Sequence, residues 1–440
     1  MTDAKGERVI YKEIIAREAN KSEGISLILQ KEQAACMPFR KINTFMKHLR
    51  IRNFGPLKNV DLDLGRINLI IGLQGSGKSC VMITACYCTW VEKRISLRQS
   101  AKEFESGTSF LDSMTGYYRT KGYVHEDTFI EYETEFMAFS YDHSTKQFTH
   151  KWKSLRWRYK RPKVSYVPAE RNMVSLVSNW NRLETNYDSI LDFKEDWDTA
   201  RRFVKSEQDI LGTGISYEYD EAAGADAVIT NSGVRVDLTS SSSGMQSLIP
   251  QFVHMDYLST GIYTAEREAK ERSYSEKQLV GTLLDVLYRR NRKKDVTDGD
   301  GRTIVVHLEG KDYVFQSVIT ASKFKKEAMN LLRTDHAEIF LEEPESNLFP
   351  PTQFLLMDWI VEMATDKSHK NTFFIATHSP YVLSHLLQEN LKDFRLMLTH
   401  PAGDGLYGVM TAAEEMIQQI YDNGSDAFFN FEPFTADETI

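Results

Sequence analysis

A glycine-rich run, G-L-Q-G-S-G-K-S, occupies Gly72 to Ser79 and matches the pattern G-x-x-x-x-G-K-[ST] at every fixed position. Glycines let backbone N–H groups turn inward around a phosphate, and the N-terminus of a following helix adds partial positive charge. Lys78 supplies a mobile cation for the β- and γ-phosphates, and the Ser79 hydroxyl is a hard oxygen ligand for Mg²⁺. The run therefore predicts a site for ATP and Mg²⁺. Its expected binding residues are Gly72, Gln74, Gly75, Ser76, Gly77, Lys78 and Ser79.

A second candidate site is an apolar run, Ile339 to Leu341, that ends in the acids Glu342 and Glu343. In phosphate-loop enzymes the first acid of such a strand belongs to the Mg²⁺ shell, and the second polarises the attacking water. We therefore expect Glu342 to hold Mg²⁺ through water, together with Ser79, and Glu343 to act as general base. The alternative is an acidic turn that is exposed to solvent. Without a phosphate loop in the same chain, the two interpretations would be about equally probable.

Two further motifs carry candidate residues. S-S-G-M-Q, Ser242 to Gln246, precedes an apolar run, and small residues at a helix N-terminus form an anion site. A serine-rich helix cap without a ligand is the common alternative. A buried strand, Phe373 to Ala376, leads into T-H-S-P, where His378 follows it. A lone histidine at such a place is more often structural than catalytic.

The elements that must position these motifs are predicted from apolar periodicity. Alternating runs at 47–53 and 60–64 predict half-buried strands, and the continuous run Ile67 to Ile71 predicts a buried parallel strand before the phosphate loop. A helix is expected over 78–95. Further expected elements are strands over 108–150 and 164–167, helices over 173–210, antiparallel strands over 215–238, a helix from Gly244, mostly helices over 260–335, strands over 338–341 and 372–376, and a helix over 351–364. The fold class is α/β.

Composition narrows the function classes. The 440 residues carry a formal net charge of -8, which disfavours a globally basic nucleic-acid binder. No apolar run is long enough to span a membrane, and the polar N-terminus lacks the apolar segment of a secretory signal. The four cysteines, Cys36, Cys80, Cys86 and Cys88, have no histidine partners at metal-ligand spacing. Reduced thiols in a cytoplasmic protein are the expectation.

The order of the four motifs resembles that of the ATP-binding-cassette ATPases. It is similar above all to their soluble branch, which holds the overcoming-lysogenization-defect (OLD) nucleases, RecF and the SMC-type heads. The closest runs are E-E-P-E-S-N-L-F-P from Glu342, A-T-H-S-P from Ala376, L-R-I-R-N-F-G-P-L-K from Leu49 and Y-V-P-A-E-R-N from Tyr166. The resemblance covers residues 46–258 and 336–385, and it implies a phosphate-loop core with a mixed sheet flanked by helices, an antiparallel β lobe, and a helical second lobe with insertions.

The resemblance also implies roles for individual residues. In that family the signature serine and glycine of one subunit close over the γ-phosphate bound by the other, and these match Ser243 and Gly244, with Gln246 beside them. His378 matches the switch histidine that contacts the γ-phosphate. Ser346 and Asn347 match the loop that crosses the dimer interface. The segment 168–172 stands in place of the glutamine loop, although it contains no glutamine.

The same resemblance implies a domain organisation. We expect an N-terminal arm (1–45), a first ATPase lobe (46–172), a signature lobe (173–335) with an insertion over 260–335, and a final core segment (336–440). OLD-type nucleases carry a Toprim nuclease domain after T-H-S-P, and residues 381–440 are too few for one. The chain is thus expected to be the ATPase of a two-protein system. It resembles the ATPase of the PARIS antiphage system, and the ATPase of the Septu system is the second resemblance.

Function hypotheses follow from this organisation. The first is an ATPase that dimerises, or forms a higher oligomer, around ATP and Mg²⁺ and controls a separate Toprim-like nuclease in antiphage defence, with a phage protein as trigger. The second is a RecF-like DNA-binding ATPase in DNA repair. The third is an ATP-locked scaffold with little turnover. A membrane partner is not expected.

Two basic segments leave nucleic-acid binding open. Lys151 to Lys163 has seven basic residues in thirteen, interleaved with Trp152, Trp157 and Tyr159. It could bind phosphate or an acidic protein, or it could be an exposed edge strand protected by its charges. Arg289 to Lys294 suits a helix C-terminus without any ligand. Asp298 to Gly301 resembles part of a calcium loop, but the closing glutamate is absent, so we interpret it as a turn.

Overall fold

The computed structural model describes residues 47–177, 180, 188–263, 274–296, 303–389, 391 and 393–423. The expected N-terminal arm, Cys36 and the turn at Asp298 lie outside the described residues. Within them, no helix combines the length and hydropathy that crossing a bilayer requires.

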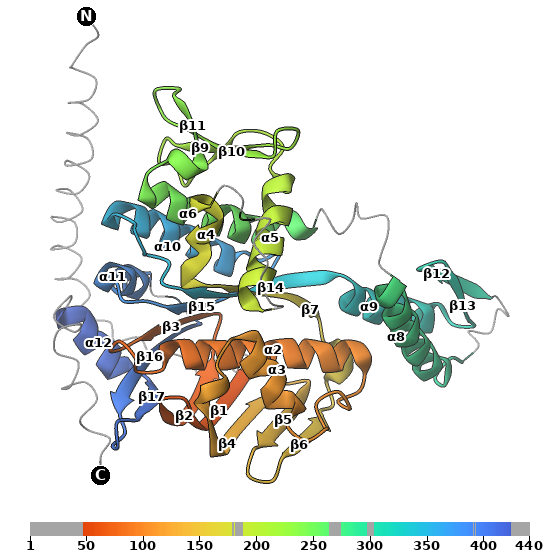
Figure 1. Ribbon diagram of the computed structural model, residues 1–440. Coiled ribbons are helices and arrows are strands. Elements are labelled where there is room, and N and C mark those ends of the chain that lie inside the picture. Colours follow the sequence, from red (N-terminus) through yellow and green to blue (C-terminus); the bar gives the residue numbers. More distant parts are fainter. Residues whose placement is uncertain are drawn as a thin grey trace, which may run out of the picture. The chain divides into compact units, whose positions relative to one another are not determined.

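A mixed sheet of eleven strands forms the centre of the protein (Figure 1), in the order β6-β5-β4-β1-β2-β17-β16-β3-β15-β14-β7. The strands β6, β5, β4, β1 and β2 are antiparallel to one another, whereas β16, β3, β15, β14 and β7 are parallel. The bounds are β1 Lys47–Phe54, β2 Leu57–Leu64, β3 Ile67–Ile71, β4 Val124–Glu133, β5 Met137–Asp142, β6 Gln147–Trp152, β7 Arg161–Val167, β14 Thr334–Glu342, β15 Thr372–Ala376, β16 Phe394–Pro401 and β17 Tyr407–Thr411. The predicted α/β class with a mixed sheet and flanking helices is confirmed.

Alternate residues of the central strands enter two different hydrophobic cores. Ile67, Leu69 and Ile71 of β3 belong to the first core, and Ile70 belongs to the second. Phe340 of β14 also faces the second core. Side chains alternate across a strand, so a strand buried on both faces is apolar throughout. That is why the run before the phosphate loop predicts a central strand.

Helices cover both faces of this sheet (Figure 1). The second core contains residues of α2 and α3, and the first contains residues of α5, α6, α10 and α11. The helices are α2 Lys78–Arg98, α3 Ser109–Tyr117, α4 Met173–Leu176, α5 Ser189–Phe203, α6 Ser243–Asp256, α8 Tyr274–Arg292, α9 Val318–Leu332, α10 Pro350–Thr365, α11 Pro380–Gln388 and α12 Glu414–Asn423. The interval 108–150 was expected to be rich in strands, and it contains β4, β5 and most of β6, whereas α3 is a helix that the prediction did not include. Its apolar residues, Phe110, Leu111 and Met114, follow helical spacing.

Three cysteines lie buried and unpaired along α2. Burial raises the pKa of the Cys80 and Cys86 thiols to about 12 and that of Cys88 well above its usual range. Such thiols stay protonated and unreactive, as expected for reduced core cysteines.

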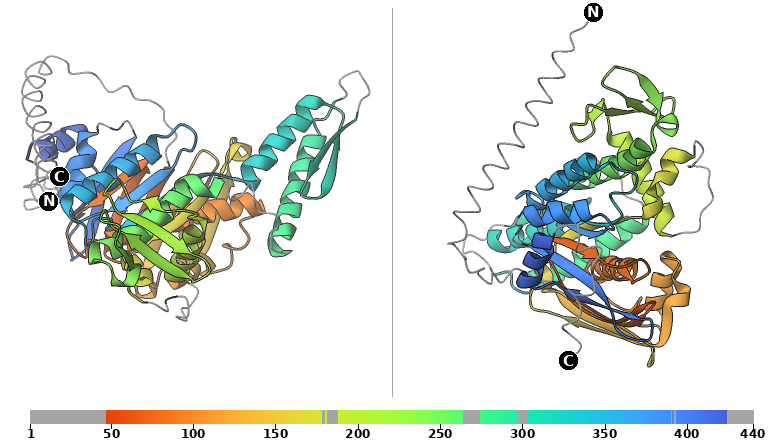
Figure 2. Two further views of the ribbon diagram at one scale, coloured as in Figure 1. Left: turned by 90° about the horizontal axis from the view of Figure 1, so that it is seen from above. Right: turned by 90° about the vertical axis from the view of Figure 1, so that its left-hand side faces the viewer.

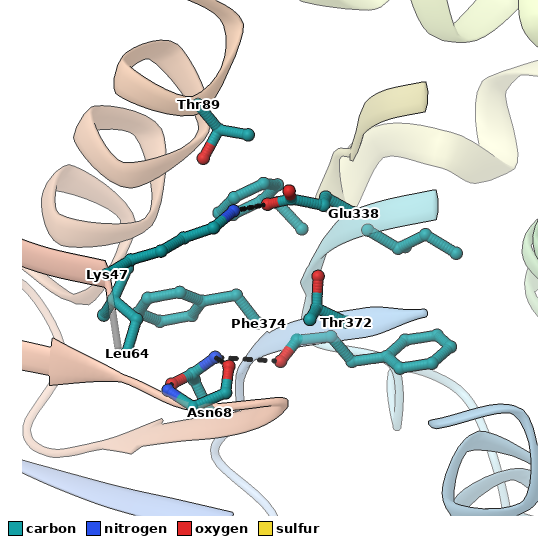
Figure 3. Close-up of a pocket in the computed structure, with 11 residues that line it drawn as sticks. Lys47, Leu64, Asn68, Thr89, Glu338, Thr372 and Phe374 are labelled. Atoms are coloured by element: carbon teal, nitrogen blue, oxygen red, sulfur yellow. Dashed lines mark hydrogen bonds and ion pairs between the residues drawn. The ribbon is translucent and has the colours of Figure 1, made fainter. Parts of the chain in front are cut away.

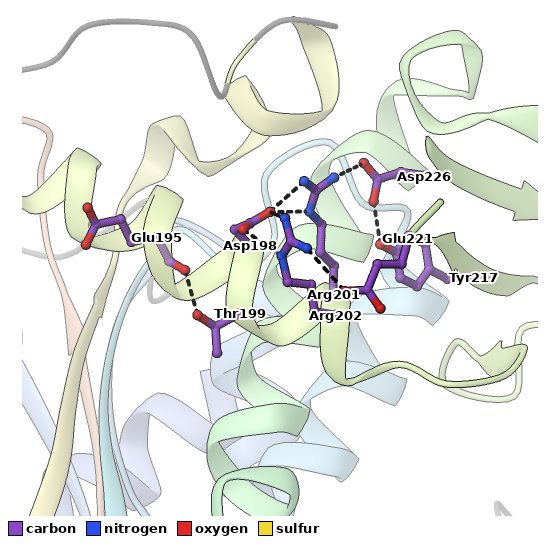
Figure 4. A network of polar contacts seen from close by, with 8 residues as sticks. All are labelled: Glu195, Asp198, Thr199, Arg201, Arg202, Tyr217, Glu221 and Asp226. Atoms are coloured by element: carbon purple, nitrogen blue, oxygen red, sulfur yellow. Dashed lines mark hydrogen bonds and ion pairs between the residues drawn. The ribbon is translucent and has the colours of Figure 1, made fainter. Parts of the chain in front are cut away.

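A smaller four-stranded sheet, β11-β10-β9-β8, accompanies α5. Its strands are β8 Gln208–Asp209, β9 Ser216–Asp220, β10 Ala225–Ile229 and β11 Arg235–Asp237. Arg201 of α5 ties the helix to this sheet (Figure 4): its guanidinium contacts Asp226 at 2.9 Å, and Asp226 accepts a hydrogen bond from Tyr217 at 2.6 Å. The same guanidinium lies 4.4 Å from the ring centre of Tyr219. A buried cation is thus paired and stacked, which holds α5 in place.

The insertion has a core of its own. Leu283, Leu287, Phe315 and Phe324 are buried between α8, α9 and the hairpin of β12 (Ile304–Leu308) and β13 (Lys311–Phe315). The left view of Figure 2 shows these elements together. The sequence predicted mostly helices here, and α8 and α9 agree with that, whereas the hairpin is an element that the prediction did not include. The two strands are short, and only Glu309 and Gly310 connect them. In the sequence such a hairpin looks like a loop between two helices.

A buried ion pair joins the first strand to the strand of the acidic motif. Lys47 of β1 donates to the Glu338 carboxylate on β14, and Asn68 of β3 donates to the carbonyl of Phe373 at 3.4 Å (Figure 3). Lys47 holds the pKa of the buried Glu338 carboxyl group at about 2, with His336 contributing. The cavity beside them measures about 20 Å³, which is room for a water molecule but not for a ligand.

Candidate functional site

The phosphate loop connects β3 to α2, and its glycines are required by close packing and backbone conformation. A Cβ atom on Gly72 would lie 1.7 Å from Oγ1 of Thr399, so no larger residue fits there. Gly77 has φ 93° directly before α2, which is the left-handed region that favours glycine. The Thr399 hydroxyl, from β16, also donates to Oγ of Ser76 at 2.8 Å, and Ser76 donates to the Leu73 carbonyl at 2.6 Å. Thr399 thus supports the loop from beneath.

Lys78 is the cation of this loop. Its Nζ donates to the carbonyls of Gly72 at 2.9 Å and Leu73 at 2.8 Å. Burial lowers the pKa of Lys78 to about 8, and the charges of Glu343 and Glu345 partly oppose that shift. An ammonium group that is largely shielded from water, beside a glycine-rich loop, can attract a polyphosphate strongly, because water weakens such an attraction. Gln74 and Gly75 lie exposed at the tip of the same loop.

Glu342 lies beside Ser79 at the end of β14. Its carboxylate contacts the Ser79 side chain, the Tyr166 hydroxyl and the backbone N–H of Ala169. Burial is the main cause of the raised pKa of Glu342, and these hydrogen bonds counter it. A hydroxyl and a carboxylate side by side are the oxygen ligands that Mg²⁺ prefers, so the donor set fits that ion.

Glu343 and His378 face each other from neighbouring strands. β14 and β15 are parallel and pair Glu342 with Ala376, so both residues follow at the same sheet edge. Oε1 of Glu343 lies 3.6 Å from Nε2 of His378. Burial, and next the charge of Lys78, lower the pKa of His378, which therefore favours a neutral ring. A carboxylate and a neutral imidazole this close can accept and relay a proton.

Arg171 was not predicted as a site residue, yet it holds the backbone on which both acids stand. Its Nη1 donates to the Glu342 carbonyl and its Nη2 to the Glu343 carbonyl, each at 2.7 Å. The side chain is 0% exposed, and burial lowers its pKa to about 10, so it stays charged at neutral pH. Glu343 has φ 42°, a left-handed conformation that this contact helps to hold. Arg171 belongs to the 3-10 helix Ala169–Asn172, the segment expected in place of a glutamine loop.

The signature motif lies against the loop that follows Glu343. Ser242 caps α6 by accepting from the Met245 N–H, and Ser243 is exposed at the helix start. A Cβ atom on Gly244 would lie 3.2 Å from the Asn347 carbonyl. The Ser247 hydroxyl of α6 donates to the Ser346 carbonyl at 2.7 Å. The structure thus brings the signature helix to residues 346–347 of the same chain.

The predicted residues therefore form two groups. The first comprises Gly72, Gln74, Gly75, Ser76, Gly77, Lys78, Ser79, Glu342, Glu343 and His378. The second comprises Ser243 and Gly244 with Ser346 and Asn347, and also Gln246, whose side chain donates to the Thr239 carbonyl at 2.9 Å. Three supporting residues were missed: Tyr166, Arg171 and Thr399. The run Y-V-P-A-E-R-N contains Tyr166 and Arg171 and was the only sequence signal for them. Arginines are rarely buried, so the burial of Arg171 was not expected, and Thr399 belongs to no recognisable motif.

The basic run from Lys151 to Lys163 is not one edge strand, contrary to one interpretation of it. It ends β6, forms the 3-10 helix Arg156–Arg158 and begins β7, so it connects the two edge strands of the large sheet. Arg156 covers Trp152 at 4.8 Å and Trp157 at 4.3 Å. Three lysines are paired with acids: Lys153 with Glu133, Lys160 with Asp335 and Lys163 with Asp196. Tyr159 is buried, so these rings offer little stacking surface to bases.

The sequence model of the AAA domain family matches residues 48–334 of this chain. The match includes the phosphate loop and the signature motif and ends at the start of β14. No curated protein matches the chain.

Solved structures are similar to the chain at low identity. The SMC head domain from Thermotoga maritima is 11% identical with a TM-score of 0.38, over 84% of this chain and 100% of that one. An Smc head domain from Pyrococcus furiosus, with an extended coiled coil and bound to the C-terminal domain of ScpA, is 11% identical with a TM-score of 0.29, over 86% and 99%. An ATP-binding cassette of an ABC transporter in its ADP conformation is 12% identical with a TM-score of 0.30, over 88% and 99%. These values are too low to support an inference about function.

Proposed function

The chain belongs to the AAA domain family, and on that premise we propose that it is a Mg²⁺-dependent ATPase whose copies close around ATP. The observation that carries the proposal is the meeting of Glu343 and His378, 3.6 Å apart, at the sheet edge beside Lys78. A base, a neutral imidazole and a phosphate-binding cation are the parts that ATP hydrolysis needs.

The chain's own residues divide the reaction among them. Lys78 and the loop N–H groups bind the β- and γ-phosphates. Glu343 accepts a proton from the attacking water as the water oxygen bonds to the γ-phosphorus. The bond from that phosphorus to the bridging oxygen breaks, which yields ADP and phosphate. His378 lies 3.6 Å from the Glu343 carboxylate, and as a neutral ring it uses its one N–H to donate a hydrogen bond to a γ-phosphate oxygen.

Ser79 and Glu342 would hold Mg²⁺, since the hydroxyl and the carboxylate are already in contact. The ion would neutralise charge on the β- and γ-phosphates. Arg171 holds both acids at the end of β14, because it donates hydrogen bonds to the backbone carbonyls of Glu342 and Glu343.

Two copies are proposed because the signature residues lie apart from the phosphate loop that they would complete. In this chain Gly244 adjoins Asn347, and Ser243 is exposed. An exposed serine at a helix N-terminus can bind the γ-phosphate held by another copy. The resemblance of the motif order to cassette ATPases supports the same arrangement.

Mixing two inactive variants tests this proposal. Lys78→Ala removes the phosphate cation, and Ser243→Arg blocks the exposed signature surface without touching the core. Each alone should be inactive. In a mixed dimer one of the two sites combines an intact Lys78 with an intact Ser243, so each mixed dimer should have about half of the activity of a wild-type dimer. About half of the dimers in an equal mixture are mixed, so the mixture should recover about a quarter of the wild-type activity. Activity of Ser243→Arg alone, or no recovery on mixing at concentrations where the wild type dimerises, would contradict shared sites.

Control of a separate Toprim-like nuclease in antiphage defence is the further proposed role. The similarity of E-E-P-E-S-N-L-F-P and A-T-H-S-P to the OLD-type ATPases supports it. The surface of the insertion, α8, α9 and the hairpin β12–β13, has its own core and takes no part in the phosphate site, so it is available to a partner. A phage protein would be the trigger.

A DNA-binding ATPase is the second candidate, and the exposed cations that end α8 favour it. Arg289, Lys293 and Lys294 are exposed there. Titration of labelled duplex DNA at two salt concentrations, with and without ATP, separates the two candidates. Tight, salt-sensitive binding that Arg289→Ala with Lys293→Ala removes would favour the DNA-binding role.

A further inference from the structure

Residues of α2, α3, β7 and α5, four elements that Figure 1 labels, line a large cavity whose lining includes no residue of the phosphate loop. Its volume is about 570 Å³, which lies within the range of small-molecule sites. One lining residue, Tyr166, also contacts the Glu342 carboxylate, and the proposed ATP chemistry uses none of the other lining residues.

Six of its sixteen lining residues are aromatic. The rings are those of Tyr87, Trp90, Tyr117, Tyr118, Tyr166 and Phe193. Tyr87 and Trp90 are stacked, with ring centres 5.7 Å apart, and Tyr118 meets Tyr166 edge-on at 5.2 Å. Trp90 remains 36% exposed. Such walls favour a flat, aromatic ligand, because stacking and burial act together on it.

The polar side of the cavity favours hydrogen-bond donors on that ligand. Asp192 and Asp196 lie one turn apart on α5 and both line the cavity. Lys163 contacts Asp196 at 2.7 Å, and the Tyr117 hydroxyl donates to Asp192. A carboxylate accepts about four hydrogen bonds, so both can take more. Burial raises the pKa of Asp192, so a donor from a ligand would stabilise its charged form.

Backbone groups add a third element. Lys163, Val164, Ser165 and Tyr166, four consecutive residues of β7, line the cavity. Side chains alternate across a strand, so four in a row can border one cavity only along the strand's edge. β7 is the last strand of the large sheet as described, and the edge of such a strand offers both N–H and C=O groups. That mixture matches the edge of a nitrogen heterocycle.

Phosphate groups do not suit this cavity. Its two cations are already paired, Lys163 with Asp196 and Arg94 with Glu103 at 3.1 Å. The five charged side chains that line it, two basic and three acidic, leave it formally negative. We propose that the cavity is a binding site for a planar nitrogen heterocycle with amino substituents and no phosphate, such as a nucleobase or nucleoside.

A glycine in the wall provides a clean test. Gly116 of α3 lines the cavity, and a Cβ atom built on it meets nothing within 4 Å. Gly116→Leu should therefore fill the cavity without a clash, and it replaces a helical glycine by a good helix former. Gly281 of α8 also has open space around its Cβ position and lies outside the cavity, so Gly281→Leu is the matched control.

The experiment is a titration of the full chain with cytidine, adenosine and guanosine, followed by calorimetry and by Trp90 fluorescence. At least one probe should bind, and Gly116→Leu should weaken it at least about tenfold, whereas Gly281→Leu should leave it unchanged. Cytidine should also bind more tightly than uridine, which lacks the amino group, and Asp192→Asn should reduce that preference. Binding at the phosphate loop would be indifferent to Gly116→Leu.

Three outcomes would overturn the proposal. The first is that none of the three probes binds at millimolar concentration. The second is that Gly116→Leu, with an unchanged unfolding temperature, binds like the wild type. If that variant does not fold, the comparison of cytidine with uridine decides. The third outcome is that cytidine and uridine bind equally tightly, both to the wild type and to Asp192→Asn.

Discussion

Nη2 of Arg171 donates to the carbonyl of Glu343 at 2.7 Å, and the same guanidinium reaches the Glu342 carbonyl. One buried cation therefore positions the proposed metal-binding carboxylate and the proposed base through their backbone, not through their side chains. Arg171 follows β7 and contacts the backbone at the end of β14, so it ties the ends of these two paired strands together.

Arg171→Met should destabilise the fold and slow ATP hydrolysis. It leaves buried carbonyls without donors, which costs about 3–5 kcal/mol in the free energy of unfolding by analogy with broken buried charge pairs. Arg171→Lys keeps the charge but loses the fork, so about 1–3 kcal/mol is expected. Urea unfolding measures both. Below the unfolding range kcat should fall while KM for ATP changes little; an unchanged kcat would remove the positioning role. Arg202→Lys, on the exposed side of α5, is the control.

Glu343→Gln should bind ATP normally but hydrolyse it about 10²–10⁴-fold more slowly, because the amide keeps the shape and cannot accept the proton. Two copies should then remain closed around ATP. Phosphate release measures turnover, and light scattering after chromatography with ATP measures the dimer. Glu126→Gln, which changes an exposed acid of β4, is the control. Wild-type turnover in Glu343→Gln would assign the base to another group.

Lys78→Ala should abolish detectable ATP binding, because it removes the cation that lies over the loop carbonyls. A fluorescent ATP analogue or calorimetry measures the affinity. Lys102→Ala, an exposed lysine after α2, should bind as the wild type does. Unchanged affinity in Lys78→Ala would show that nucleotide binds elsewhere.

ATP affinity should fall as the pH rises through the pKa of Lys78, which burial lowers to about 8. Below that value the ammonium is charged and binds phosphate; above it the amine is neutral and does not. Affinity should decrease by up to about tenfold per pH unit between about pH 8.5 and 9.5. Calorimetry at pH 8.5 in two buffers of different ionisation enthalpy should also detect proton uptake on binding. A flat profile across this window would contradict the assignment of Lys78 as the phosphate cation.

The purified chain should not cut nucleic acid. The acids that end β14, Glu342 and Glu343, are both used in the proposed ATP site, and the effector is proposed to be a separate protein. Supercoiled plasmid incubated with the chain, Mg²⁺ or Mn²⁺ and ATP should stay intact on a gel. The Glu343→Gln preparation serves as the control for contaminating nucleases. Metal-dependent cleavage by both preparations that persists after further purification would overturn this division of labour.

The sequence alone identified the local parts of the site. The phosphate loop, the acids after Leu341 and the histidine after Ala376 each follow an apolar run, and such runs predict buried strands. Periodicity also predicted β1, β2, β3 and α2 because burial on one or both faces imposes a period on a single segment. These features depend on residues that are close in the sequence, so the sequence alone is enough to predict them.

The tertiary structure alone decided which strands are neighbours. β14 lies between β15 and β7, which sets Glu343 beside His378 and brings Arg171 under both acids. The sequence did not reveal this, because strand order depends on pairing between distant segments, and a buried arginine looks like a surface charge until its partners are known. The same limit hid Thr399 beneath Gly72: only folding brings β16 against the phosphate loop.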